Sequence, residues 1–257
     1  MILAIDISNT HTKLGVYDGE QLRGHWRLPS RRDYTVDECG ILTKLLCQEA
    51  GITVDRITRT VIGSVVPSLT SIYQEMVDRY FQTVPLIVTA DLEIGLTIHY
   101  DNPRGVGADR IANAVGAFER YGGPAIVVDL GTATTFDVIS PEGDYVGGVI
   151  APGIETSAAE LFQRAARLWG VEIAVPDRVI GQDTEQCLRA GIVYGAVGQV
   201  DGIVERIWEE LGARAVVIAT GGLAGLITPL SRTIQQLDPL LTLDGLRRIA
   251  LRVDGRS

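Results

Sequence analysis

The sequence predicts an α/β fold made of two similarly built lobes, each with a mixed sheet flanked by helices. Two observations support this: apolar β-type runs alternate with helical patterns, and one strand-turn-strand pattern occurs twice. In both copies, at residues 3–18 and 126–139, an apolar strand ends in aspartate, a turn rich in threonine follows, and a second apolar strand begins. Turn residues gather at 121–124, so we expect lobes over 1–121 and 122–257.

Each copy is expected to continue into a third strand, because a turn with glycine and acidic residues follows it. In the first half, the capping-box spacing from Thr35 to Glu38 predicts a helix that runs towards Ala50. The remaining pattern predicts, in chain order, a strand at 60–66, a helix at 69–80, a short strand at 85–89 and a helix after Gly107 with Ile111, Ala114, Val115 and Phe118 on its apolar face.

The second half repeats the alternation. A helix is expected at about 155–169, and the spacing from Asp183 to Gln186 predicts a long helix towards Leu211. Residues 215–220 read as a strand that runs into a glycine pair and a following helix.

Composition excludes several classes of protein. The net charge is −9 and the basic residues Arg23, Arg27, Arg31 and Arg32 are dispersed, so they read as a solvated face and a nucleic-acid partner is not expected. The three cysteines form no CxxC pair, which favours a reduced, cytoplasmic protein over a zinc or disulfide framework. The N-terminus reads as a strand rather than a signal peptide, and no apolar run is long enough for a membrane helix.

The acid-tipped turns are the first candidates for chemistry. Behind Asp6, the residues Ser8, Asn9, Thr10 and Thr12 can offer N–H groups and hydroxyls to phosphate oxygens, while the carboxylate holds hydrated Mg²⁺. One such turn alone is as well explained by an ordinary hairpin, because Asn and Ser favour turns for local reasons. The second copy, at Asp129, favours two turns that face one phosphate-binding cleft.

Asp109 and Arg110, at the start of a predicted helix, are the next candidates. Asp109 could act as a general base for an alcohol, and Arg110 could bind a carboxylate. An aspartate in a first helical turn also has a plain structural explanation, since it complements the helix dipole. GxGxxG and GxxxxGK[ST] motifs are absent, which disfavours Rossmann and P-loop sites, and neither the histidines nor the serines have metal-site or hydrolase spacing.

Taken together, these segments resemble type III pantothenate kinases, within the superfamily of acetate and sugar kinases, Hsp70 and actin. The matching motifs are DISNT at 6–10, YDNP at 100–103, GADR at 107–110, VDLGTATT at 128–135, GGVIAPG at 147–153 and TGG at 220–222. The resemblance covers nearly the whole chain, and it implies two duplicated ribonuclease H-like, actin-like lobes.

The resemblance also implies an activity. The family uses ATP to phosphorylate pantothenate to 4'-phosphopantothenate, the first step of coenzyme A synthesis, with Mg²⁺ and a monovalent cation (K⁺ or NH₄⁺), in a homodimer that shares its active site. Carried over by motif, the ATP-binding residues are Asp6, Ile7, Ser8, Asn9, Thr10, His11, Thr12, Lys13 and Thr132. The pantothenate-binding residues are Tyr100, Gly107, Ala108, Asp109, Arg110 and Thr184, with Asp109 the proton acceptor, Asp129 on the monovalent cation and Asp6 near Mg²⁺.

One position departs from the family pattern, which usually has glycine where this chain has Ser8. If that position requires φ > 0, Ser8 costs about 1 kcal/mol or the turn shifts. Two other functions stay open: a kinase of the same fold that acts on another alcohol or carboxylate, and a non-catalytic accessory protein. The joint presence of Asp6, Asp109, Arg110 and Asp129 argues against the accessory protein.

Overall fold

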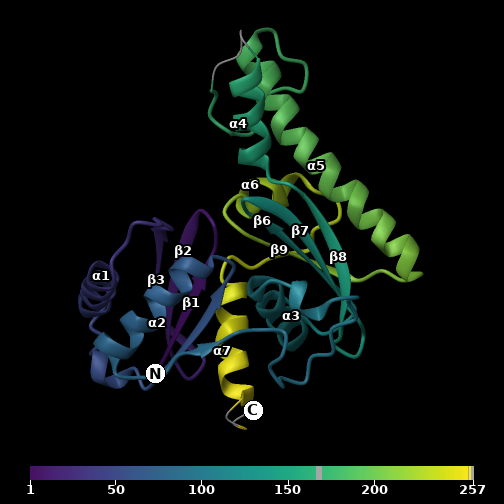
Figure 1. Cartoon of the computed structure of the whole chain (residues 1–257). Coiled ribbons are helices and arrows are strands. Elements are labelled where there is room, and N and C mark those ends of the chain that lie inside the picture. The colour runs from purple at the N-terminus through teal and green to yellow at the C-terminus, as the bar shows by residue number, and fades with distance from the viewer. Residues whose placement is uncertain (166–169, 254, 256–257) are drawn as a thin grey trace. The chain divides into compact units, whose positions relative to one another are not determined.

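The computed structural model describes residues 1–165, 170–253 and 255. The chain forms two compact units (Figure 1). The first contains Met1–Glu119 together with Leu240–Ser257, and the second contains Arg120–Pro239.

The first unit is built on a five-stranded mixed sheet. Its strand order is β3-β2-β1-β4-β5, where β1 pairs antiparallel with β2 and parallel with β4. The strands are β1 (Ile2–Ile7), β2 (His11–Asp18), β3 (Gln21–Pro29), β4 (Arg59–Ser64) and β5 (Leu86–Ile87).

The second unit repeats this topology strand for strand. Its order is β10-β9-β6-β7-β8, with β6 antiparallel to β7 and parallel to β9. The strands are β6 (Ala125–Leu130), β7 (Ala133–Ile139), β8 (Tyr145–Pro152), β9 (Val216–Thr220) and β10 (Gln236–Leu237). The predicted α/β class and the duplication, including the third strand of each meander, are therefore confirmed.

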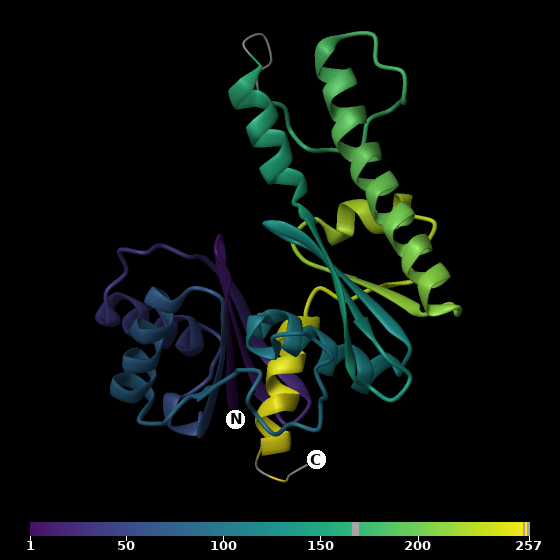
Figure 2. The ribbon, with the colours of Figure 1, turned by 45° about the vertical axis from the view of Figure 1, so that its right-hand side comes forward.

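Helices cover both faces of the first sheet (Figures 1 and 2). One core joins the strands to α1 (Val36–Glu49) and α2 (Pro67–Phe81), with Leu3, Ile5 and Ile62 fully buried in it. On the other face α7 (Leu241–Val253) packs on β1 and β4, and α3 (Ala108–Tyr121) crosses α7 closely. That crossing depends on glycine, because a Cβ on Gly245 would lie 1.9 Å from the Ala112 carbonyl oxygen.

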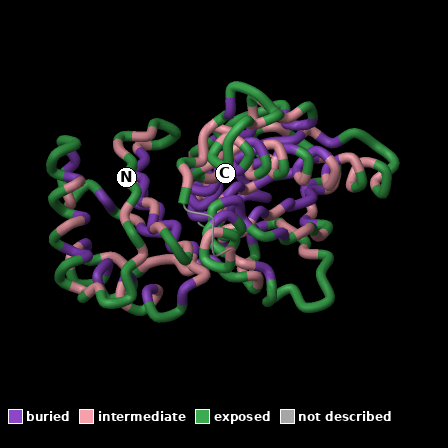
Figure 3. The backbone as a smooth tube through the Cα atoms, turned by 90° about the horizontal axis from the view of Figure 1, so that it is seen from above, coloured by how far each residue is buried: buried purple, intermediate pink, exposed green. Residues whose placement is uncertain are grey.

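The second sheet packs on the long helix α5 (Thr184–Leu211), with Ile126, Val128 and Val200 buried in the shared core. The central strands β1 and β6 are almost entirely buried, whereas the edge strand β3 has no buried residue. Figure 3 shows the buried and exposed positions along the backbone. Helix α4 (Ile154–Arg164) lies beside α5, and α6 (Ala224–Ile227) has only four residues. Short 3-10 turns are η1 (Val54–Arg56), η2 (Pro103–Gly105) and η3 (Thr228–Leu230).

The predicted helix starts agree with the structure. The Thr35 side chain accepts from the Glu38 N–H at 3.2 Å and the Glu38 carboxylate accepts from the Thr35 N–H, which completes the capping box of α1. Asp183 caps α5 by accepting from the Gln186 N–H at 2.8 Å. The predicted end of the α4 helix, at 166–169, lies outside the described residues.

The compact units differ from the expected lobes, 1–121 and 122–257, in the place of the C-terminal helix. Because α7 packs on β1 and β4, residues 240–257 group with the first unit rather than with the residues that precede them. No helix in the described part of the chain has the length and apolarity to cross a membrane.

Candidate active site

The first acid-tipped turn joins β1 to β2. The Ser8 N–H donates to the His11 carbonyl at 3.1 Å and closes the turn over Asn9 and Thr10. From outside the hairpin, the Ser30 N–H donates to the Thr10 carbonyl at 3.0 Å. The predicted phosphate-binding residues 6–13 thus form one tight hairpin with defined support.

Asp6 is almost completely buried, at 2% exposure, and is paired with a cation. Lys13 stands opposite it on β2, and the Lys13 Nζ lies 3.3 Å from the Asp6 Oδ2. The Ser8 hydroxyl donates to the other carboxylate oxygen at 3.3 Å. The described residues contain no cluster of three or more His, Cys, Asp or Glu suited to a metal. A single carboxylate suits Mg²⁺, which binds through one or two carboxylates plus phosphates and water.

Ser8 does not require the conformation that glycine favours. Among the described residues other than glycine, only Gln82 has a positive φ. The hairpin therefore accepts serine without left-handed strain, and the penalty considered from the sequence does not arise.

Asp109 lies in the first turn of α3, as predicted, and its carboxylate accepts the Arg110 N–H at 2.8 Å. Gly107 makes room for that carboxylate, because a Cβ at residue 107 would lie 2.4 Å from the Asp109 Oδ1. Arg110 is 7% exposed. A side chain at residue 107 would therefore displace the Asp109 carboxylate.

The end of β4 brings the first turn and the start of α3 together. Gly63 stands opposite Asp6, and a Cβ on Gly63 would lie 3.7 Å from the Ala108 Cβ. The Val65 N–H donates to the Ile7 carbonyl at 3.1 Å, and the Val65 Cγ1 would lie 3.2 Å from a Cβ on Gly107. Two predicted parts of the site therefore flank one strand end. Sequence reasoning missed Gly63, although a glycine inside a strand signals close approach.

The second acid-tipped turn joins β6 to β7 through Gly131 and Thr132. The Gly131 N–H donates to the Ala133 carbonyl at 3.1 Å, and the Thr156 hydroxyl donates to the Thr132 carbonyl at 2.7 Å. Asp129 occupies the same place in β6 as Asp6 in β1, one residue before the strand ends.

Two threonines and a glycine lie next to Asp129. Its neighbours in the ladder are Thr135 on β7 and Thr220 on β9. The Thr220 hydroxyl is fully buried and has no hydrogen-bond partner among the described residues. Gly221 has φ +97°, and a Cβ there would lie 2.5 Å from the Asp129 Oδ1. The sequence marked this glycine pair only as a weak turn signal, whereas its backbone in fact packs against the carboxylate.

The other predicted residues are divided between the units. Tyr100 is 39% exposed and precedes η2 in the first unit, whereas Thr184 begins α5 in the second. That Asp129, Thr132 and Thr184 meet the residues of the first unit in one cleft stays a prediction.

Two units with one topology, each carrying an acid-tipped hairpin, define the fold of actin-like ATPases and sugar kinases. Solved structures with this fold include the (R)-2-hydroxyglutaryl-CoA dehydratase component A from Acidaminococcus fermentans, with a TM-score of 0.57 and 14% identity over 99% of this chain and 98% of that one. The ROK hexokinase from Thermus thermophilus has a TM-score of 0.51 and 13% identity, with 99% of each chain covered.

Within that class, the chain belongs to the type III pantothenate kinase family. The family model for type III pantothenate kinase matches residues 2–206. The type III pantothenate kinase of Moorella thermoacetica is 50% identical over 247 residues, 96% of this chain and 97% of that protein. The one from Myxococcus xanthus is 50% identical over 249 residues, 97% of each. The resemblance noted from the motifs is confirmed.

Proposed function

We propose that this protein transfers the terminal phosphoryl group of ATP to pantothenate, giving 4'-phosphopantothenate for coenzyme A synthesis in the cytoplasm. The observation that carries the proposal is family membership over nearly the whole chain, at 50% identity. The placement of Asp6 and the Asp109 turn on either side of the end of β4 supports it.

The roles follow from what phosphoryl transfer requires, which is positioning and charge neutralisation more than covalent help. Residues 6–13 and Thr132 bind ATP, with Asp6 beside Mg²⁺, which neutralises phosphate charge when bound. Asp109 orients the pantothenate hydroxyl and accepts its proton. The remaining pantothenate-binding residues are Tyr100, Gly107, Ala108, Arg110 and Thr184.

The decisive experiment measures product. With Mg²⁺ and K⁺ present, the purified protein should convert pantothenate and ATP to 4'-phosphopantothenate and ADP, and Asp109→Asn should lower kcat about 10²- to 10⁴-fold. Asp91→Asn is a matched control, because Asp91 is an exposed carboxylate of the same unit that pairs with Arg104. If other alcohols or carboxylates are phosphorylated and pantothenate is not, the chain is a kinase with another acceptor. A fully active Asp109→Asn variant would refute the role of the base.

A monovalent cation belongs to the same proposal, with Asp129 as its carboxylate ligand. The partnerless buried hydroxyl of Thr220, beside Asp129 in the ladder, supports it, because a bound K⁺ or NH₄⁺ would satisfy that oxygen.

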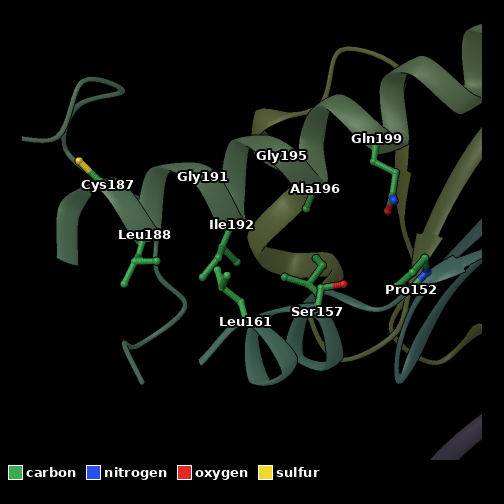
Figure 4. A pocket seen from close by; sticks show the side chains of 12 residues that line it. Pro152, Ser157, Leu161, Cys187, Leu188, Gly191, Ile192, Gly195, Ala196 and Gln199 are labelled. Carbon is green, nitrogen blue, oxygen red and sulfur yellow. The ribbon is translucent and has the colours of Figure 1, made fainter. Parts of the chain in front are cut away.

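A homodimer with a shared active site is also proposed. Between α4 and α5 lies a mostly apolar pocket of about 320 Å³ (Figure 4), and Leu161, which lines it, is 43% exposed. Gly191, Gly195 and Gly198 lie on an exposed side of α5 with open space around them. Glycine costs about 1 kcal/mol within a helix, and close approach of a second copy would explain its use here.

A substitution in the pocket between α4 and α5 tests the proposed dimer. Leu161→Glu should shift the protein to monomer in size-exclusion chromatography with light scattering, and activity should fall with it. Leu45→Glu is the matched control, since Leu45 is 51% exposed on α1. A Leu161→Glu protein that stays dimeric would place the interface elsewhere.

A further inference from the structure

Ser30, the first residue after β3, holds the first acid-tipped turn at two points. Its N–H donates to the Thr10 carbonyl at 3.0 Å, and its hydroxyl lies 2.9 Å from the Thr12 hydroxyl. The sequence motifs did not single out Ser30, which follows Thr12 by 18 residues in the chain. The turn that the proposed function places on ATP is therefore anchored from outside its own hairpin.

The strand register places Thr12 on the side of β2 that faces the core. Lys13 stands opposite Asp6 and pairs with it, so Lys13 is on the face of the charged pair. Successive residues of a strand point to opposite faces. Thr12 is therefore on the other face together with Leu14, which is buried in the core with α1 and α2. Thr12 is fully buried as well, so its hydroxyl meets Ser30 behind the turn.

The bond from the Ser30 N–H fixes the orientation of one peptide group of the turn. A peptide unit is planar, so a bond to the Thr10 carbonyl holds the whole unit between Thr10 and His11. Backbone N–H groups attract a phosphate, whereas a carbonyl oxygen repels it. While the Thr10 carbonyl is bonded to Ser30, that oxygen cannot rotate towards a bound phosphate.

Folding stability alone does not require this pair of hydroxyls. A buried hydroxyl needs a partner, but replacing both partners by apolar groups of similar shape is nearly neutral for folding. Valine also suits a buried strand position such as residue 12. What the pair adds is the placement of Ser30, whose N–H holds the Thr10 carbonyl.

We propose that Ser30 is a positioning residue for ATP, which keeps the first turn in its phosphate-binding form through the Thr10 carbonyl and the Thr12 hydroxyl. The proposal rests on the function proposed above, because that function places residues 6–13 on ATP. It is tested on nucleotide binding without pantothenate, so that its failure and the failure of pantothenate phosphorylation are distinguishable.

The test is a double-mutant cycle on nucleotide affinity, measured by calorimetry with Mg²⁺ and a non-hydrolysable ATP analogue. Ser30→Ala and Thr12→Val should each weaken binding about fivefold, the typical effect of losing one hydrogen bond. The double variant should be no weaker than Thr12→Val alone, because either substitution breaks the same pair. Its melting temperature should stay close to that of the wild type, because both hydroxyls are removed together.

Ser140→Ala is the matched control. The Ser140 hydroxyl also holds a hairpin turn, between β7 and β8, by accepting from the N–H groups of Glu142 and Asp144 at 3.1 Å each. This substitution removes a turn hydroxyl outside the predicted site, so the variant should bind the nucleotide as the wild type does.

Three outcomes would overturn the proposal. A Ser30→Ala variant with the affinity of the wild type would remove Ser30 from nucleotide binding, and additive losses would show that Ser30 and Thr12 act independently. An equal loss in Ser140→Ala would mean that loosening any turn weakens binding. If the cycle behaves as expected while pantothenate is not phosphorylated, this inference stands and the acceptor is another molecule.

Discussion

The two acid-tipped hairpins have the same strand pairing, but different residues stand opposite the acid. In the first unit, Asp6 is opposite Lys13 and forms an ion pair with it at 3.3 Å. In the second, the corresponding Asp129 has Thr135 and Thr220 as its ladder neighbours and Gly221 against its carboxylate. The acid therefore has the same position in both hairpins, whereas the residues opposite it in the ladder differ.

Two buried acids outside the hairpins, Asp244 in the first unit and Asp201 in the second, also differ in their hydrogen-bond donors. On α7, the Asp244 carboxylate accepts from the Arg247 Nε at 2.8 Å and from the Arg248 Nε at 2.6 Å. Burial by itself would raise the pKa of Asp244, but the bonds from Arg248 and Arg247 outweigh it and lower that pKa below its ordinary value.

Asp201, a buried acid of the second unit, is bonded mainly by hydroxyls. On α5, the Asp201 carboxylate accepts from the Ser231 hydroxyl at 2.6 Å and from the Thr233 hydroxyl at 2.8 Å. Burial opposes ionisation here too, but the bonds from Ser231 and Thr233 lower the pKa of Asp201. Asp244 is therefore stabilised mainly by cations, and Asp201 mainly by neutral donors.

The largest expected effect tests this contrast. Asp244→Asn should lower the free energy of unfolding by about 3–5 kcal/mol, because it leaves the buried Arg247 without its charge partner. Asp201→Asn should lower it by only about 1–3 kcal/mol, the cost of weakened hydrogen bonds. Urea titration at neutral pH measures both, and equal losses would break the comparison.

The pH dependence of those losses has a defined sign. Both folded pKa values lie below the unfolded ones, so each carboxylate contributes stability above the unfolded pKa, about 3.9. The contribution is lost as the pH falls through the folded pKa. The difference between wild type and either variant should therefore shrink as the protein is acidified below about pH 4.

The second effect concerns the hairpins themselves. Asp129→Asn should lower kcat about 100-fold and abolish its dependence on K⁺, because electrostatic groups at such sites typically contribute 10²- to 10³-fold. Asp6→Asn should instead weaken binding of the Mg²⁺ nucleotide and leave the K⁺ dependence in place. Rates measured across K⁺ and Mg²⁺ concentrations separate the two, and identical responses would show that the hairpins are not specialised.

A smaller change in stability is expected when Gly221 or Gly195 is replaced by alanine. Gly221→Ala should lower stability by about 2 kcal/mol, because its φ is +97° and the added Cβ would lie 2.6 Å from the Leu130 nitrogen. Gly195→Ala should raise monomer stability by about 1 kcal/mol, since it sits in open space within a helix. Thermal unfolding of both variants at low protein concentration checks the opposite signs.

The smallest expected effect concerns the reactivity of the three thiols and not the stability of the fold. The thiols of the first unit, Cys39 and Cys47, are buried, and burial raises the pKa of Cys47 to about 11. Cys187 in the second unit is exposed. A colorimetric thiol reagent at about pH 8 should therefore modify Cys187 rapidly, and Cys39 and Cys47 only after unfolding. The thiolate is the reactive form of a cysteine. Rapid reaction of all three would contradict the burial of the first-unit core.

The sequence was sufficient for features that depend on local pattern. The strand-turn-strand repeat, the capping box at Thr35, the N-cap at Asp183 and the helix start at Asp109 are all encoded within a few residues. It was not sufficient for contacts between distant segments, such as the approach of Leu246 to Gly63 or of Gly221 to Asp129, because a glycine does not reveal which atom approaches it. The grouping of α7 with the first unit was missed for the same reason.

Helix α7 also has a consequence for synthesis of the chain. The second unit is continuous, from Arg120 to Pro239, whereas the first needs Leu240–Ser257 to cover one face of its sheet. A ribosome adds roughly 5–20 residues per second, so β1 and β4 are made well before the helix that covers one face of their sheet. Nascent chains that stop before α7 would expose that apolar face.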